Sequence, residues 1–282
     1  MDFMGFEETT IRQVNQRNIE HDDACQKIII GMREIEKFLS RYGLLSFGRD
    51  FAFCRNHSFS MQMVSTACEL TVGSIISCCE SGCLSDANSL LRKYRDDLFF
   101  YLYIVVYSKS NQMEIKTAKL KQMEDNIEKW INNNLCDLSI GTVMQAIGQS
   151  PLAKDAVTKY HLQSYFKTIG EKLNNYVHSN GINYYNRNVN TYTGNSLQVQ
   201  MQELLNDLRF LTITFVFLLT ICFPLSIMST DYVDYLEYNE TPPDGSQYWV
   251  APFVNEFFNQ NLDLIDKGCI DYLRENTLME FN

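Results

Sequence analysis

Apolar residues recur every three or four positions along most of the chain, and this spacing predicts amphipathic helices. The first predicted helix covers about residues 11–42. Its apolar side consists of Ile28, Met32, Ile35, Leu39 and Tyr42. Further helices are predicted over about 58–79, 85–107, 112–133, 139–147, 151–180, 195–228 and 252–274. Such a series of amphipathic faces predicts an all-α fold, a multi-helix antiparallel bundle of about seven or eight helices.

Capping residues mark several of the predicted helix ends. Ser85 is a good N-cap for the helix over 85–107, and Ser150 followed by proline is a typical N-cap and first position. Gly181 ends the helix that starts there, and the Asn-rich stretch 182–195 follows as a polar loop. The stretch from Gly43 to His57 breaks the helical period and is expected to connect two helices.

Two segments are apolar on nearly every side. Residues 98–107 form a run of ten, too short to cross a bilayer, and are expected at the centre of the bundle. Residues 210–228 carry no charge, which satisfies the length criterion for one membrane span. Arg209 lies before this segment and Asp231 after it, a bias for the N-terminal side inside. The alternative is a central bundle helix that ends near Pro224, and the sequence leaves both open.

These segments divide the chain into three parts. Residues 1–195 are expected to form a helical bundle. Residues 196–229 form one long helix, whose apolar half is a candidate membrane span. Residues 230–282 form an acidic, aromatic C-terminal tail with a last helix.

Charge and cysteine content narrow the possible functions. The chain has 282 residues with 24 basic and 34 acidic side chains, a formal net charge of −10, which excludes a nonspecific DNA-coating protein. Nine irregularly spaced cysteines indicate reduced core thiols in the cytoplasm, and Cys78, Cys79 and Cys83 lack the spacing of a zinc site. Residues 1–8 contain neither a basic nor an apolar signal region. We expect a cytoplasmic protein, anchored to the inner membrane if 210–228 spans it.

Familiar catalytic motifs are missing from the sequence. The four histidines show no metal-binding spacing, and GxGxxG, GxxxxGK[ST] and GxSxG do not occur. We therefore expect no metal and no cofactor. Zinc hydrolases, dinucleotide-binding enzymes, P-loop NTPases and α/β-hydrolases have no motif here.

One segment carries chemistry at a predicted helix end. In residues 171–181, His178 follows Lys172, Asn174 and Asn175. A histidine here can act as general base or acid on a ribose hydroxyl while a cation steadies the phosphate. The structural alternative is a helix-terminal histidine that interacts with the last carbonyls and the helix dipole.

Antiparallel helices with a late polar segment ending in histidine resemble the HEPN superfamily. The resemblance covers about residues 20–228 in outline, and residues 89–98 and 245–253 are similar to segments of uncharacterised bacterial helical proteins. Active members carry Arg, four to six residues and then His. Here Asn174 and His178 match, but Leu173 stands where Arg is expected, and Lys172 lacks the bidentate fork of Arg. The resemblance implies a homodimer with paired motif helices.

The resemblance also implies a function. It implies a metal-independent endoribonuclease, an RNA-cleaving effector in bacterial stress or antiphage defence, with His178 as acid or base and Lys172, Asn174 and Asn175 as helpers. One alternative is a non-enzymatic, membrane-anchored effector or interaction protein. Another is a small-ligand-binding bundle lined by Tyr101, Tyr103 and Tyr107.

Arg92 and Arg95 form a second candidate group. They lie beside Asp96 and Asp97, so they can form ion pairs within the bundle or a phosphate-binding patch at the site. The ion pairs are favoured, because the neighbouring carboxylates would cancel much of the potential that attracts an anion.

Overall fold

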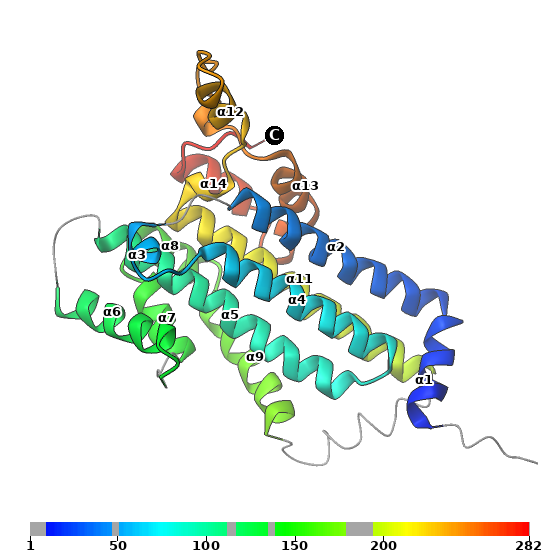
Figure 1. The fold of residues 1–282 in the computed structure, drawn as a ribbon. Helices are drawn as coiled ribbons and strands as arrows, with labels where there is room; N and C mark the ends of the chain where they lie inside the picture. Colours follow the sequence, from blue (N-terminus) through cyan, green and yellow to red (C-terminus); the bar gives the residue numbers. More distant parts are fainter. Residues whose placement is uncertain (1–9, 47–50, 112–116, 135–138, 179–193, 282) are drawn as a thin grey trace, which may run out of the picture.

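The computed structural model describes residues 10–46, 51–111, 117–134, 139–178 and 194–281. These residues form thirteen α-helices and three short 3-10 helices, and no strand runs through them beyond two isolated β-bridges. The predicted all-α, multi-helix bundle is confirmed. Figure 1 shows the longest helices lying side by side.

The helices have the following bounds. The first part of the chain forms α1 (Ile11–Glu20), α2 (Asp23–Leu45), α3 (Ala52–Asn56), α4 (Met61–Glu80), α5 (Leu84–Asn111), α6 (Ala118–Ile131) and α7 (Ile140–Ile147). The second part forms α8 (Pro151–Lys159), α9 (Leu162–Val177), α11 (Gly194–Cys222), η2 (Pro224–Ile227), α12 (Asp231–Glu237), η3 (Ser246–Tyr248), α13 (Pro252–Asn261), η4 (Leu262–Leu264) and α14 (Cys269–Asn276).

The expected number of helices was too low because three predicted helices are each split in two. The helix predicted over 11–42 breaks at His21, because the Asp22 carboxylate accepts hydrogen bonds from the N–H groups of Ala24 (2.9 Å) and Cys25 (3.0 Å) and starts α2. The helix predicted over 151–180 breaks at His161, which has a positive φ of 52°. The helix predicted over 252–274 divides into α13 and α14. Helices α3 and α12 were not predicted.

The predicted N-cap is confirmed at Ser150 and wrong at Ser85. Ser150 caps α8 with Pro151 in its first turn, as expected. Ser85 is not an N-cap: α5 already starts at Leu84, and the Ser85 hydroxyl is buried without a hydrogen-bond partner in the described part of the chain. Gly181 and nearly all of the predicted loop 182–195 lie outside the described residues.

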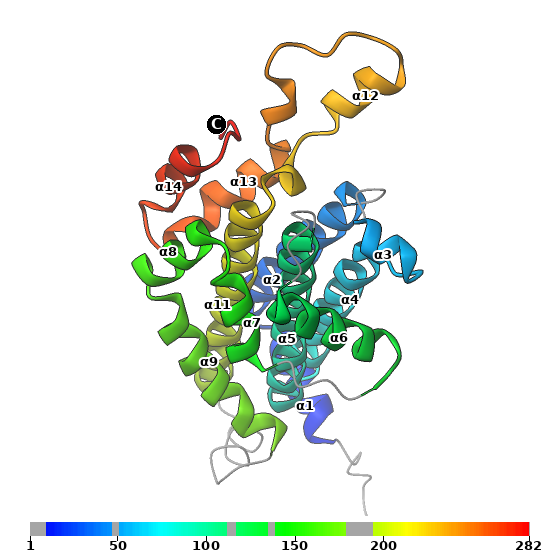
Figure 2. The same ribbon diagram turned by 90° about the vertical axis from the view of Figure 1, so that its left-hand side faces the viewer.

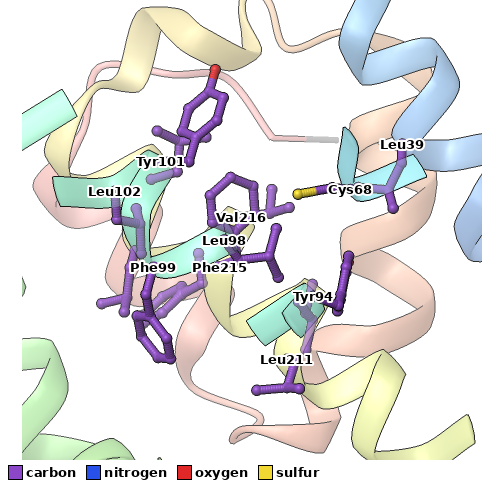
Figure 3. Packing of buried hydrophobic residues seen from close by; sticks show 14 of the residues in the cluster. Leu39, Cys68, Tyr94, Leu98, Phe99, Tyr101, Leu102, Leu211, Phe215 and Val216 are labelled. Atoms are coloured by element: carbon purple, nitrogen blue, oxygen red, sulfur yellow. The ribbon is translucent and has the colours of Figure 1, made fainter. Parts of the chain in front are cut away.

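Helix α5 is the centre of the bundle. It packs against α4, α6, α7, α9 and α11 (Figures 1 and 2). Every residue from 98 to 107 is buried, as the all-round apolar pattern predicted. Figure 3 shows Leu98, Phe99 and Leu102 of α5 lying toward Leu211 and Phe215 of α11.

Helix α11 carries the apolar segment that raised the membrane alternative. Its stretch Ser196–Cys222 is long and apolar enough to cross a membrane, yet 89% of its most apolar window is buried inside the protein. Helices α2, α5, α8, α13 and α14 contact it, and the helix ends before Pro224. This burial supports the buried-helix alternative, because lipid would find little uncovered apolar surface on α11 in this fold.

The C-terminal residues belong to the same core. Val254 and Phe258 of α13 and Leu273 of α14 are almost fully buried. Phe257 stacks on Phe38 of α2 with ring centroids 3.9 Å apart. Residues 252–281 therefore contribute to one hydrophobic cluster with the bundle, and the arm around α12 projects from it (Figure 2).

The described cysteines are free thiols. All eight lie in buried or half-buried positions. Burial raises the pKa of Cys25 to about 11 and the pKa of both Cys222 and Cys269 to about 12. These groups stay protonated near neutral pH. No cluster of potential metal ligands occurs among the residues that the structure describes, and Cys136 lies outside them.

Candidate functional site

The candidate site lies where the C-terminal half of α9 runs along the N-terminal half of α5. The Phe166 ring meets Phe99 edge to face at 4.7 Å between centroids. Two turns later, Asn174 meets Arg92. Later residues of α9 contact earlier residues of α5, so the two helices are antiparallel.

Arg92 is the cation that faces α9. Its Nε donates a hydrogen bond to Asp96 Oδ2 at 2.8 Å, and its Nη1 donates to the Asn174 Oδ1. The side chain is 29% exposed, so solvent reaches it. Arg92 is thus oriented by Asp96 on its own helix and by Asn174 on the neighbouring helix, at the protein surface.

His178 lies at the end of the same α9 surface. It is the C-cap of α9, and its backbone N–H donates to the Asn174 carbonyl at 3.1 Å. Its side chain is exposed. Because residues four apart lie on one side of a helix, Arg92, Asn174 and His178 share one solvent-facing surface. His178 thus stands at the helix end, the position that the structural alternative requires.

Lys172 is directed elsewhere. Its Nζ lies 2.6 Å from Asp207 Oδ2 and 3.7 Å from Glu203 Oε2, both on α11. Two carboxylates therefore neutralise this cation and tie α9 to α11. Asn175 is exposed beside the site. The structure brings Asn174 and Arg92 together but pairs Lys172 with a different helix.

Arg95 occupies the interior. Its side chain is 1% exposed, and its Nε and Nη2 donate to Asp96 Oδ1 at 3.0 and 2.7 Å. Burial lowers the pKa of Arg95, and the Asp96 carboxylate partly offsets this. Its Nη1 has no hydrogen-bond partner among the described residues. Arg95 also lines a cavity of about 10 Å³, room for no more than about one water molecule. A phosphate in solution has no access to Arg95 here.

The favoured ion-pair interpretation of the two arginines agrees with this geometry. Both Arg92 and Arg95 contact Asp96, whereas Asp97 pairs with Lys93 at 2.5 Å. Arg92 alone retains exposure that an anion could use.

The tyrosines proposed to line a ligand site are core residues. Tyr101, Tyr103 and Tyr107 are at most 5% exposed. The Tyr101 hydroxyl lies 3.5 Å from that of Tyr42, and Asn126 Nδ2 donates to the Tyr103 hydroxyl at 3.3 Å. These contacts place Tyr101 and Tyr103 in packing between helices.

Two relationships were not visible in the sequence. Arg92 and Asn174 are separated by 82 positions, so only the α5–α9 packing reveals their contact. Asp207 was missed as the partner of Lys172. In the sequence, Asp207 is a carboxylate just before an uncharged apolar run. In the structure it is only 9% exposed, and a carboxylate buried to this extent needs a partner.

Comparison with known proteins provides no relative for this site: no protein-family model, curated protein or solved structure matches the chain.

Proposed function

We propose that this chain is a HEPN-like endoribonuclease that cleaves RNA without a metal ion, as an effector in bacterial stress or antiphage defence. The contact between Arg92 and Asn174, one helical turn before His178, carries the proposal. It places a guanidinium against the residue one turn before an exposed histidine, and a cation and a general base are groups that promote cleavage at a ribose 2′-hydroxyl.

The missing arginine of the resemblance has a structural explanation. Leu173 occupies the position where the family pattern has Arg, and Leu173 is fully buried. An arginine there would point into the core. Arg92 on α5 reaches the same α9 surface from outside, so one chain supplies both cation and histidine. The proposed site does not require the predicted homodimer.

The proposed reaction uses the 2′-oxygen of RNA as nucleophile. A His178 ring nitrogen takes the 2′-hydroxyl proton, and the 2′-oxygen forms a bond to the adjacent phosphorus. The bond from phosphorus to the 5′-oxygen then breaks, leaving a 2′,3′-cyclic phosphate, and the 5′-oxygen receives a proton from the imidazolium. Arg92 stabilises the negative charge that develops on the phosphoryl oxygens. Asn174 orients Arg92 through its side-chain oxygen.

The decisive experiment compares two helix-terminal histidines. His178→Ala should reduce cleavage of a single-stranded RNA by at least about 100-fold, as expected for loss of a general base. His21 is the matched control, because it also caps a helix C-terminus, that of α1. His21→Ala should cleave like the wild type. Equal activity of the His178→Ala variant and the wild type would remove His178 from the mechanism, and an inactive wild type would refute the proposal.

The membrane-anchored alternative receives less support. Thr212, Ile213 and Val216 in the apolar half of α11 are fully buried by neighbouring helices. A carbonate wash of a cell membrane fraction tests this directly. We expect the protein in the supernatant, whereas retention in the pellet would favour the anchor.

A further inference from the structure

A basic cavity lies on the side of the bundle formed by α2, α11 and α13. Its volume is about 440 Å³. The basic side chains at the cavity are Lys37, Arg41 and Arg209, the acidic ones are Glu34 and Glu256, and Phe38, Phe253 and Phe257 provide aromatic surface. The charged lining is therefore net positive, in a chain whose overall charge is −10.

The cations of this cavity are poorly neutralised. Among the described residues, Lys37 and Arg41 have no ion-pair partner, and the closest carboxylate to Arg209 is Glu34 at 3.7 Å. Gly31 lets Arg209 approach α2, because a Cβ there would lie 2.9 Å from the Arg209 Nη2. The cavity thus offers unused positive charge next to aromatic rings, which suits an acidic segment with aromatic side chains.

An arm of this composition projects from the same protein. Residues 231–245 contain five carboxylates and no basic side chain, half of the chain's formal net charge. No residue of α12 is buried, and Leu236 and Tyr238 are 51% and 78% exposed. Within the described part of the chain, the five carboxylates make no ion pair. Figures 1 and 2 show α12 standing away from the body of the bundle.

The base of the arm is fixed next to the cavity. The Ser229 N–H donates to the Trp249 carbonyl at 2.7 Å, and the Ala251 N–H donates to the Ile227 carbonyl at 2.9 Å. These bonds join the two ends of the arm immediately before α13, whose first turns line the cavity at Phe253. The projecting arm and the cavity are therefore neighbours on one side of the molecule. In a dimer with a twofold axis, the arm of each copy can then contact the cavity of the other.

We propose that two copies of this chain associate by exchanging arms, with residues 231–245 of each copy lying over the basic cavity of the other and a few of their side chains entering it. The exposed tyrosine and leucine of the arm meet the phenylalanines of the cavity, and the arm carboxylates meet Lys37, Arg41 and Arg209. Reciprocal contact closes the dimer and buries both arms. The dimer is independent of the proposed cleavage site, which lies between α5 and α9.

A charge-reversal exchange tests the proposal with the full chain. Sedimentation velocity should show a wild-type dimer that weakens when salt is raised, because the contact is largely electrostatic. The arm variant Asp234→Lys/Glu237→Lys/Glu240→Lys changes the formal charge of residues 231–245 from −5 to +1. This variant and the cavity variant Lys37→Glu/Arg41→Glu should each raise the dimer dissociation constant by roughly tenfold or more. Mixing the two variants should restore a dimer, because both reciprocal contacts then join opposite charges.

The matched control is Lys27→Glu/Arg33→Glu, which makes the same charge change on α2 outside the cavity. It should dimerise like the wild type. The proposal is overturned by a wild type that stays monomeric, by a cavity variant that dimerises as well as this control, or by a mixture of the two charge-reversed variants that stays monomeric.

Discussion

The Arg95 guanidinium of α5 lies over Gly170 of α9, with little room for a side chain between them. A Cβ on Gly170 would lie 3.0 Å from the Arg95 Nη1, closer than ordinary van der Waals contact. Arg95 cannot move outward, because its side chain is buried and held by Asp96. The absence of a side chain at residue 170 therefore sets how closely α9 approaches α5.

Enlarging residue 170 should loosen this helix pair. We expect Gly170→Val to reduce the free energy of unfolding by about 1–3 kcal/mol through overpacking, measured by urea denaturation. Gly141→Ala is the control, because a Cβ there meets only the Ser139 Oγ at an ordinary 3.5 Å. Its stability should equal or exceed that of the wild type by up to about 1 kcal/mol, because alanine favours a helix over glycine. Equal stability of Gly170→Val would show that α9 moves away from α5 at little cost.

Two of the buried threonines of α11, Thr212 and Thr214, should respond in opposite directions to the same substitution. Thr212 Oγ1 lies 2.7 Å from the Tyr94 hydroxyl, whereas Thr214 Oγ1 is buried with no partner in the described part of the chain. Thr212→Val leaves the Tyr94 hydroxyl unpaired and should cost about 1–3 kcal/mol. Thr214→Val removes an unpaired hydroxyl and should raise stability by roughly 1 kcal/mol.

Chemical denaturation of the two threonine variants measures this difference directly. The wild type should lie between them. A loss of stability in both would mean that Thr214 has a partner, such as a bound water, which the geometry of the side chains does not supply.

Helix type and burial were predictable where the cause is local. Ser150 and Pro151 are sufficient to predict the start of α8. Residues 98–107 are apolar on nearly every side, so burial of the whole segment was predictable. The break at His21 was missed, because the hydrophobic period continues across it while the Asp22 side chain caps the next helix. The free-energy difference between starting a new helix at the cap and continuing the old one is small, and the spacing of apolar residues does not report it.

The candidate site was only half predictable for a different reason. Asn174 and His178 lie one turn apart, so sequence spacing alone puts them on one surface. Their cation was expected from Lys172, which the structure pairs with Asp207 instead. Arg92 comes from another helix, and no local rule reports which helices lie side by side.

Asp22 should make stability depend on pH. Its hydrogen bond from Gln198, at 2.5 Å, and those from the Cys25 and Ala24 N–H groups lower its pKa from the ordinary 3.8. The stabilisation is therefore fully present above pH 3.8 and disappears as pH falls through the lower folded-state pKa. Asp22→Ala should cost about 1 kcal/mol at pH 7, with the difference from the wild type shrinking in acid.

Urea titrations at several pH values check this dependence, and Asp22→Asn separates capping from charge. Asparagine caps a helix equally well but does not titrate. Its contribution should stay constant where that of aspartate declines. A constant gap between wild type and Asp22→Ala down to strongly acid pH would exclude the carboxylate as the stabilising group.

Replacing Arg92 by lysine tests whether the guanidinium itself stabilises the reacting phosphate. The planar guanidinium of Arg92 contacts Asp96 and Asn174 together and still has an N–H group to donate to a phosphate. Lysine keeps the positive charge but lacks this planar fork. RNA cleavage by Arg92→Lys should fall roughly 10- to 100-fold, with the change mainly in kcat. Arg92 is partly exposed, so the lost ion pair should cost under about 1 kcal/mol of stability, and unfolding should not account for the loss. Arg33→Lys is the matched control, because Arg33 pairs with Glu80 on the surface away from α9. An Arg92→Lys variant that cleaves like this control would mean that charge alone suffices at residue 92.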